Sequence, residues 1–139
     1  MMDFRIEVLT LPVGDVDRAL RFYVDRVGFA LDVDYQPTPS FRVVQVTPPG
    51  SAASVQFGLG LTDAAPGSAR ANYLAVPDIE AAHAALSTRG VSVSAVRHKA
   101  SADWQGDFVP GVDPERRPYA SVLDFADPDG NTWIVQEKP

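Results

Sequence analysis

The sequence predicts an α+β fold in which two βαβββ modules follow one another along a chain of 139 residues. Two observations carry this prediction. A local motif occurs twice, and each copy is followed by several stretches in which apolar and polar residues alternate as they do in β-strands. Hydrophobic residues make up 45% of the chain and charged residues 22%, which is typical of globular proteins.

The repeated motif marks the start of a helix in each module. Its two copies are Leu11–Leu20 and Leu74–His83. Asp15 and Asp78 stand at matching places in the copies, where a short carboxylate accepts hydrogen bonds from the free amides of a helix's first turn. Gly28 and Gly90 follow, and glycine suits the left-handed residue just past a helix end. The sequence therefore predicts one helix between each aspartate and its glycine.

The remaining patterned stretches are predicted strands, bounded by turns rich in proline, glycine and aspartate. They are Phe4–Val13, Leu31–Tyr35, Phe41–Thr47 and Ala53–Leu59 in the first module, then Ala71–Val76, Val91–Val96, Ala120–Ala126 and Thr132–Gln136 in the second. Residues 63–70 are rich in alanine, glycine and serine and form the expected linker. The modules accordingly span residues 1–62 and 71–139.

Charge and composition exclude several functions. The chain has 12 Lys and Arg against 18 Asp and Glu, a net charge of -6, so a nucleic-acid partner is not expected. The absence of cysteine removes disulfides and sulfur-ligated metals. No apolar run approaches the roughly 18 residues that span a bilayer, and no signal-peptide pattern opens the chain. We therefore expect a cytoplasmic protein without a membrane partner.

Three motifs occur in a characteristic order. They are Leu11-Pro-Val-Gly-Asp-Val-Asp-Arg-Ala-Leu-Arg-Phe-Tyr23 with Gly28-Phe29, Val76-Pro-Asp-Ile-Glu-Ala-Ala82, and Phe125-Ala-Asp-Pro-Asp-Gly-Asn131. Together they resemble the vicinal oxygen chelate superfamily, which includes glyoxalases, bleomycin-resistance proteins and extradiol dioxygenases. The resemblance covers nearly the whole chain. It implies two modules whose curled mixed sheets surround a cup for a ligand or metal, and it implies a homodimer.

The resemblance also implies positions for metal ligands. Counting along the three motifs leads to Val8, Ala71 and Ile134. These side chains have no lone pair to offer, and the fourth position falls near Gln56, a weak neutral ligand for Zn²⁺ or Fe²⁺. A shift of one residue would bring Glu7 and Asn72 into the cup, and that set still lacks a histidine. We therefore expect no metal and no other cofactor.

If the three hydrocarbon side chains face the cup, strand alternation places Tyr73 and Gln136 beside them. Gln45 is expected there in preference to Arg42, because a buried guanidinium without a partner is costly. Tyr119 starts a strand and can donate a hydrogen bond inward. The alternative is that these side chains pack a filled core between the sheets.

The segment 99–118 is the longest stretch without a strand or helix pattern. Its Trp104 and Phe108 favour a flap folded over the cup, because long ordered loops often cover binding sites. Contact with the sheet edge or with a second subunit is the alternative. His98 lies at the base of this segment and is the imidazole best placed to act as a general base; the alternative is a solvated histidine at a strand end.

These features predict a protein that binds a small, partly aromatic molecule without a metal, as the drug-sequestering members of the family do. The candidate ligand-binding residues are Gln45, Tyr73, His98, Trp104, Tyr119 and Gln136. The acidic chain suits a cationic or neutral ligand. One alternative is an enzyme: a lyase, isomerase or dioxygenase with relocated metal ligands, or a metal-free acid–base catalyst using His98, Tyr73 or Tyr119. Another is a structural module whose cup is filled.

Overall fold

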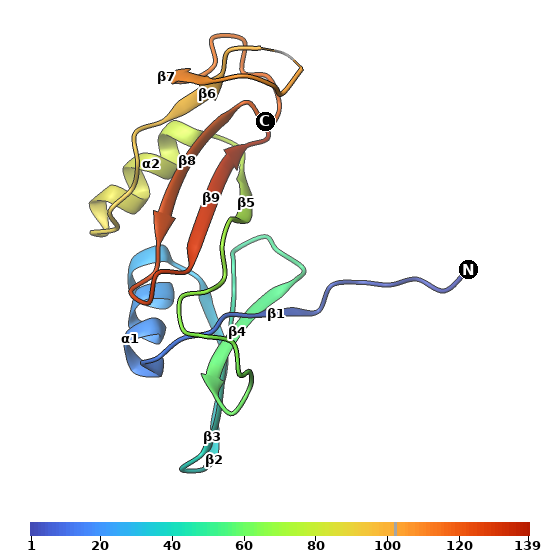
Figure 1. The fold of residues 1–139 in the computed structure, drawn as a ribbon, viewed down its shortest axis with the longest axis vertical. Helices are drawn as coiled ribbons and strands as arrows, with labels where there is room; N and C mark the ends of the chain where they lie inside the picture. The colour runs from blue at the N-terminus through green and yellow to red at the C-terminus, as the bar shows by residue number, and fades with distance from the viewer. Residues whose placement is uncertain (102) are drawn as a thin grey trace. The chain divides into compact units, whose positions relative to one another are not determined.

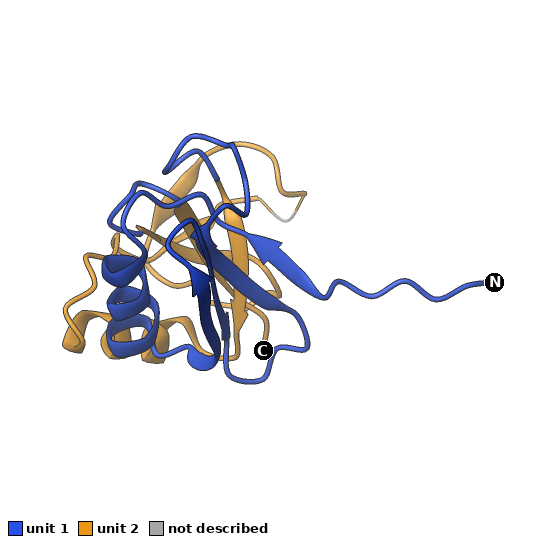
Figure 2. Ribbon diagram, turned by 90° about the horizontal axis from the view of Figure 1, so that it is seen from below, with its two compact units in different colours: residues 1–69, 127–131 blue, residues 70–126, 132–139 orange. Residues whose placement is uncertain are grey.

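The computed structural model describes residues 1–101 and 103–139, and it shows an α+β fold with two mixed sheets (Figure 1). Contacts divide the chain into two units, coloured in Figure 2. Unit 1 contains residues 1–69 and 127–131, and unit 2 contains residues 70–126 and 132–139. Within the described ranges no helix is long and apolar enough to cross a membrane.

Unit 1 has a four-stranded sheet with a helical segment on one face. Its elements are β1 (Val8–Thr10), α1 (Val16–Arg21), the π-helical η1 (Phe22–Val27), β2 (Ala30–Thr38), β3 (Phe41–Thr47) and β4 (Ser54–Leu59). The strand order is β1-β4-β3-β2, with β1 parallel to β4 and the other pairs antiparallel. Val44 and Val46 are fully buried on the helical side, where the ring of Tyr23 lies 5.6 Å from that of Phe57.

Unit 2 has a five-stranded sheet covered on one face by a single helix. Its elements are β5 (Asn72–Val76), α2 (Ile79–Thr88), β6 (Arg97–Lys99), β7 (Phe108–Pro110), β8 (Ser121–Ala126) and β9 (Thr132–Glu137). The order is β5-β9-β8-β6-β7, with β5 parallel to β9. Ile79 of α2 is buried, as are Leu123 and Val135 of the strands that α2 contacts.

Both predicted helix starts and ends are confirmed. The carboxylate of Asp15 accepts a 3.0 Å hydrogen bond from a first-turn amide of α1, and that of Asp78 accepts 3.0 and 3.1 Å bonds from α2. Gly28 and Gly90 have φ angles of 92° and 85°. A side chain at either position would meet the steric penalty of the left-handed region.

One predicted strand is too long and another is absent. Only Val8–Thr10 of the expected Phe4–Val13 is a strand, and residues 1–7 are exposed and extend away from the unit 1 sheet (Figures 1 and 2). Val91–Val96 is not a strand. There the Ser94 hydroxyl accepts a 2.9 Å hydrogen bond from the Asp124 amide, taking the place of a backbone acceptor. The ladder therefore forms only beyond it, at β6.

The segment 99–118, expected to lack regular structure, contains β7, which pairs with β6 as a hairpin. Ala102, within this segment, lies outside the described residues. The side-chain amide of Asn131 and the hydroxyl of Tyr23 both donate to Asp127, at 2.8 Å each. Asn131 also donates to the carbonyl of Pro12 at 2.9 Å. The Asp-Pro-Asp-Gly-Asn motif is therefore a structural turn of unit 1.

Candidate functional site

A pocket of about 210 Å³ opens on the face of the unit 2 sheet opposite α2, and we call it the unit 2 pocket. Its lining residues are Tyr73, Arg97, Lys99, Trp104, Phe108, Tyr119, Val122, Ile134 and Gln136. The set is mainly aromatic and aliphatic, with a few polar groups among them. That composition is typical of sites for small organic ligands.

Strand register builds the floor of this pocket. Ile134 of β9 pairs with Tyr73 of β5, and Gln136 pairs with Val122 of β8. Residues paired in register share a face, and neighbours along a strand alternate. The alternate residues, such as Val135, are buried on the α2 side. Tyr73 in contrast is 59% exposed, so its ring is available to a ligand.

The hairpin of β6 and β7 supplies a wall that carries two cations. Lys99 pairs in register with Phe108, and its Nζ lies 4.2 Å from the centre of that ring. The guanidinium carbon of Arg97 lies 4.9 Å from the same ring centre. Both are cation–π distances, because the face of an aromatic ring is electron-rich. In the described part of the chain no Asp or Glu lines the pocket.

Trp104 and Tyr119 form the aromatic rim, with ring centres 6.4 Å apart. Their φ angles are 66° and 68°, in the left-handed region that non-glycine residues rarely adopt. Such strain persists only where the surrounding structure imposes it, and it clusters at ligand clamps and active sites. Both residues that carry the rim rings therefore have a left-handed backbone conformation.

The loop before Tyr119 is held by an ion pair between Arg117 and Asp113. Arg117 donates from its backbone amide and from Nε to one oxygen of the buried Asp113, at 2.8 Å each. This bonding to Arg117 lowers the pKa of Asp113 to about 2. Arg117 also donates to the carbonyl of Lys99 at 2.8 Å. The loop is therefore tied to the strand that carries Lys99.

Four predicted ligand-binding residues come together in the unit 2 pocket: Tyr73, Trp104, Tyr119 and Gln136. His98 is not among them. Its register partner is Ser121, which is buried on the α2 side, and its Nδ1 lies 2.7 Å from the carbonyl oxygen of Gly111. Gln45 lies in unit 1 on β3, where it pairs with Gln56 on the sheet face away from α1.

Arg97 and Lys99 are the charged lining residues that were not predicted from the sequence. They are the neighbours of His98 along the strand, so their side chains point to the sheet face opposite to that of His98. The available signal for these two residues was their spacing, because charged residues two positions apart in a strand lie on the same face. This signal could not be used because the strand was predicted at Val91–Val96. Arg97 and Lys99 then lay outside any predicted strand and had no predicted face.

The three positions implied for metal ligands carry the side chains of Val8, Ala71 and Ile134. Val8 pairs with Ser54, and Ile134 with Tyr73. Beside Val8, the amide of Gln56 donates to the hydroxyl of Thr10 at 2.9 Å. Across residues 1–101 and 103–139, no three His, Asp or Glu side chains gather closely enough to hold a metal ion.

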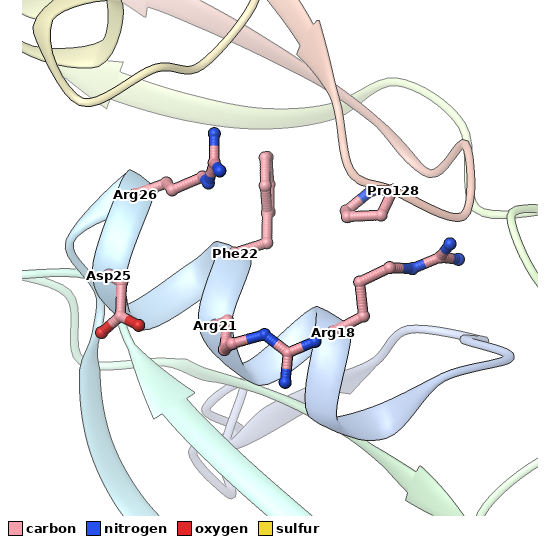
Figure 3. Close-up of a pocket in the computed structure, with 6 residues that line it drawn as sticks. All are labelled: Arg18, Arg21, Phe22, Asp25, Arg26 and Pro128. Carbon is pink, nitrogen blue, oxygen red and sulfur yellow. The ribbon is translucent and has the colours of Figure 1, made fainter.

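A second pocket, of about 570 Å³, lies on unit 1. Figure 3 shows its lining residues Arg18, Arg21, Phe22, Asp25, Arg26 and Pro128. The three guanidinium groups point in different directions (Figure 3), and Arg18 forms a 3.2 Å ion pair with Asp129. These cations therefore do not converge on one point of the pocket (Figure 3).

Comparison with known proteins gives consistent matches. The antibiotic binding protein TnmS3 from Streptomyces sp. CB03234 is 30% identical over all of this chain and 99% of its own, with a TM-score of 0.73. A glyoxalase/bleomycin resistance protein from the same Streptomyces is 31% identical, covering 95% of this chain and 99% of that one, with a TM-score of 0.69.

A superfamily member from Sphaerobacter thermophilus DSM 20745 is 29% identical over 99% of this chain and 100% of its own, with a TM-score of 0.72. The comparison with curated proteins gave no match. The family model for the Glyoxalase/Bleomycin resistance protein/Dioxygenase superfamily matches residues 5–135. This chain therefore belongs to that superfamily.

Proposed function

We propose that this protein binds a small aromatic molecule in the unit 2 pocket and acts by sequestering it. The observation that carries the proposal is the convergence of Tyr73, Trp104 and Tyr119 on one pocket with Gln136 as a polar group. Flat rings offer a large contact area at little cost in side-chain entropy. The likeness to an antibiotic binding protein supports this function.

The proposed binding needs no metal. The positions that the family resemblance assigns to metal ligands carry Val8, Ala71 and Ile134, whose hydrocarbon side chains cannot donate an electron pair to an ion. These residues do not fit a divalent metal at those positions. A ligand would instead be held by the shape of the pocket, by ring contacts and by hydrogen bonds to its few polar groups.

The proposal includes a homodimer. The strand β2 is an edge of the unit 1 sheet and exposes Val33 and Tyr35. Exposed apolar edge strands are surfaces that proteins cover by pairing. A second copy of this chain is the partner that the family resemblance implies.

A panel of aromatic antibiotics and metabolites tests the binding function. We expect at least one compound to raise the thermal midpoint of the protein, to bind once per chain in calorimetry, and to be recovered chemically unchanged. Tyr73→Ala should weaken this binding about tenfold or more, as loss of an aromatic contact does. Phe4→Ala is the matched control, because Phe4 is an exposed aromatic residue of unit 1 that lies outside both β2 and the unit 2 pocket.

Two results would count against the proposal. One is a panel in which no compound stabilises the folded protein. The other is binding that Tyr73→Ala and Phe4→Ala weaken equally, because this would place the ligand outside the unit 2 pocket. Conversion of a bound compound into a product would favour an enzyme instead of sequestration.

A further inference from the structure

The unit 2 pocket has a charge opposite to that of the protein. The whole chain has a net charge of -6. The pocket wall nevertheless carries Arg97 and Lys99, and no carboxylate lines it in residues 1–101 and 103–139. The charge of the pocket lining therefore differs from that of the whole chain, although Asp124, which does not line the pocket, pairs with Arg97.

Lys99 has only a neutral partner. Its Nζ donates to the carbonyl oxygen of Gly106 at 3.1 Å and lies over the ring of Phe108. It forms no ion pair within 4.0 Å with an Asp or Glu of the described ranges, in contrast to Arg116 and Arg117. Among residues 1–101 and 103–139, no carboxylate therefore neutralises the charge of Lys99 through an ion pair.

Arg97 is only loosely paired. It donates to the hydroxyl of Ser94 at 3.2 Å and to the carboxylate of Asp124 at 3.3 Å, longer than the usual distance for a charge-assisted hydrogen bond. Its guanidinium shares the ring of Phe108 with Lys99. Two cations beside one ring repel each other, and an anion placed next to them would relieve that repulsion.

The size and walls of the pocket define the rest of the ligand. A cavity of about 150 Å³ takes up benzene, so a pocket of about 210 Å³ has room for one to two fused rings. Tyr73, Trp104 and Tyr119 offer ring faces to such a group. We propose that the unit 2 pocket selects planar aromatic molecules that carry an anionic group, a carboxylate or an ionised phenol, which Lys99 and Arg97 bind.

This inference rests on the proposed binding function and is tested with three matched probes. They are naphthoate, naphthalenemethanol and naphthylmethylammonium, which share one ring system and differ in charge. We expect the protein to bind naphthoate about tenfold more tightly than the alcohol, and the ammonium most weakly. Added salt should weaken naphthoate binding more than binding of the alcohol. Quenching of Trp104 fluorescence reports on the site, and Trp104→Phe should abolish that signal.

Variants of Lys99 identify the group responsible. Lys99→Met should remove the preference for naphthoate while leaving binding of the alcohol within about twofold, and Lys99→Arg should retain the preference. Arg89→Gln is the matched control, because it removes a cation from an exposed residue of unit 2 that does not line the pocket.

The outcomes separate this inference from the proposed function. Equal affinity for the three probes, or a preference for the ammonium, would overturn the anionic selectivity and leave aromatic binding intact. A preference that survives Lys99→Met and Arg97→Gln would also overturn it. If naphthoate fails to bind below about 1 mM, the inference is wrong, and the compound panel alone then decides the proposed function.

Discussion

Tyr23 shows how single residues hold the turn that completes unit 1. Its side chain is 0% exposed, and its hydroxyl donates to Oδ2 of the buried Asp127 at 2.8 Å. Tyr23→Phe keeps the ring but leaves that carboxylate with one donor fewer. We expect a loss of about 1.5–3 kcal/mol in the free energy of unfolding, the range for hydrogen bonds to charged groups.

Urea denaturation followed by circular dichroism measures this loss. Tyr35→Phe is the matched control, because the exposed Tyr35 has no hydrogen-bond partner among the described residues, and its free energy of unfolding should change by less than about 0.5 kcal/mol. Equal effects of the two substitutions would show that the Asp127 carboxylate does not depend on the Tyr23 hydroxyl.

Asp113 makes stability depend on pH. The bonds from Arg117 lower its pKa to about 2, from an ordinary value of 3.8. A pKa depressed in the folded state means that the carboxylate's stabilising contribution is complete above the ordinary value and disappears as pH falls toward the folded-state value. Asp113→Asn should therefore lower the thermal midpoint at neutral pH, and its gap from the unmodified protein should close as the pH falls from about 4 to 2.

Thermal unfolding across this pH range checks the expectation. Asp63→Asn removes the same charge at an exposed position and should show no such closing gap. A gap between Asp113→Asn and the unmodified protein that stays constant down to pH 2 would contradict the assigned ion pair.

At the scale of elements, Gly58 allows β3 and β4 to approach each other. A Cβ at this residue would lie 1.8 Å from the carbonyl oxygen of Arg42, a backbone atom that moves only with its strand. Gly58→Ala should therefore cost at least about 2–3 kcal/mol in the free energy of unfolding, as overpacking does. Chemical denaturation measures it.

Gly50→Ala provides the comparison. Gly50 has a φ of 85°, and a Cβ there would meet nothing within 4 Å. Its substitution should cost only the penalty of the left-handed region, about 1–2 kcal/mol. If Gly50→Ala were the more damaging change, close strand approach at Gly58 would not limit the stability of unit 1.

The helices could be predicted from the sequence because their signals are local: Asp15 and Asp78 bind the amides of their own helices, and Gly28 and Gly90 end them. The position of strand β6 could not be predicted from the sequence. Its position depends on Ser94 bonding to Asp124, thirty residues away, and no pattern around Val91–Val96 records that contact.

The same difference between local signals and long-range contacts explains which residues of the candidate site could be predicted. Tyr73 and Gln136 could be placed by alternation, because each lies within a regular strand. Tyr119 reaches the pocket through a positive φ just before β8, while Ser121, of the same parity, is buried on the other face. The face of His98 was likewise set by its pairing with Ser121, a tertiary contact that local sequence does not specify.

At the scale of the whole molecule, β2 makes the protein's assembly testable. It is a nine-residue edge strand whose residues are all exposed, including Val33 and Tyr35. We expect a dimer by size-exclusion chromatography with light scattering, because covering this apolar edge removes it from water.

The double variant Val33→Lys with Tyr35→Lys should raise the dimer dissociation constant about tenfold or more by placing charge in the contact. Ser87→Lys with Thr88→Lys adds the same charge on the exposed end of α2 and should leave the dimer intact. A protein that is monomeric at all concentrations would show that β2 is not the interface. A dimer whose dissociation constant does not change in the β2 variant would show the same.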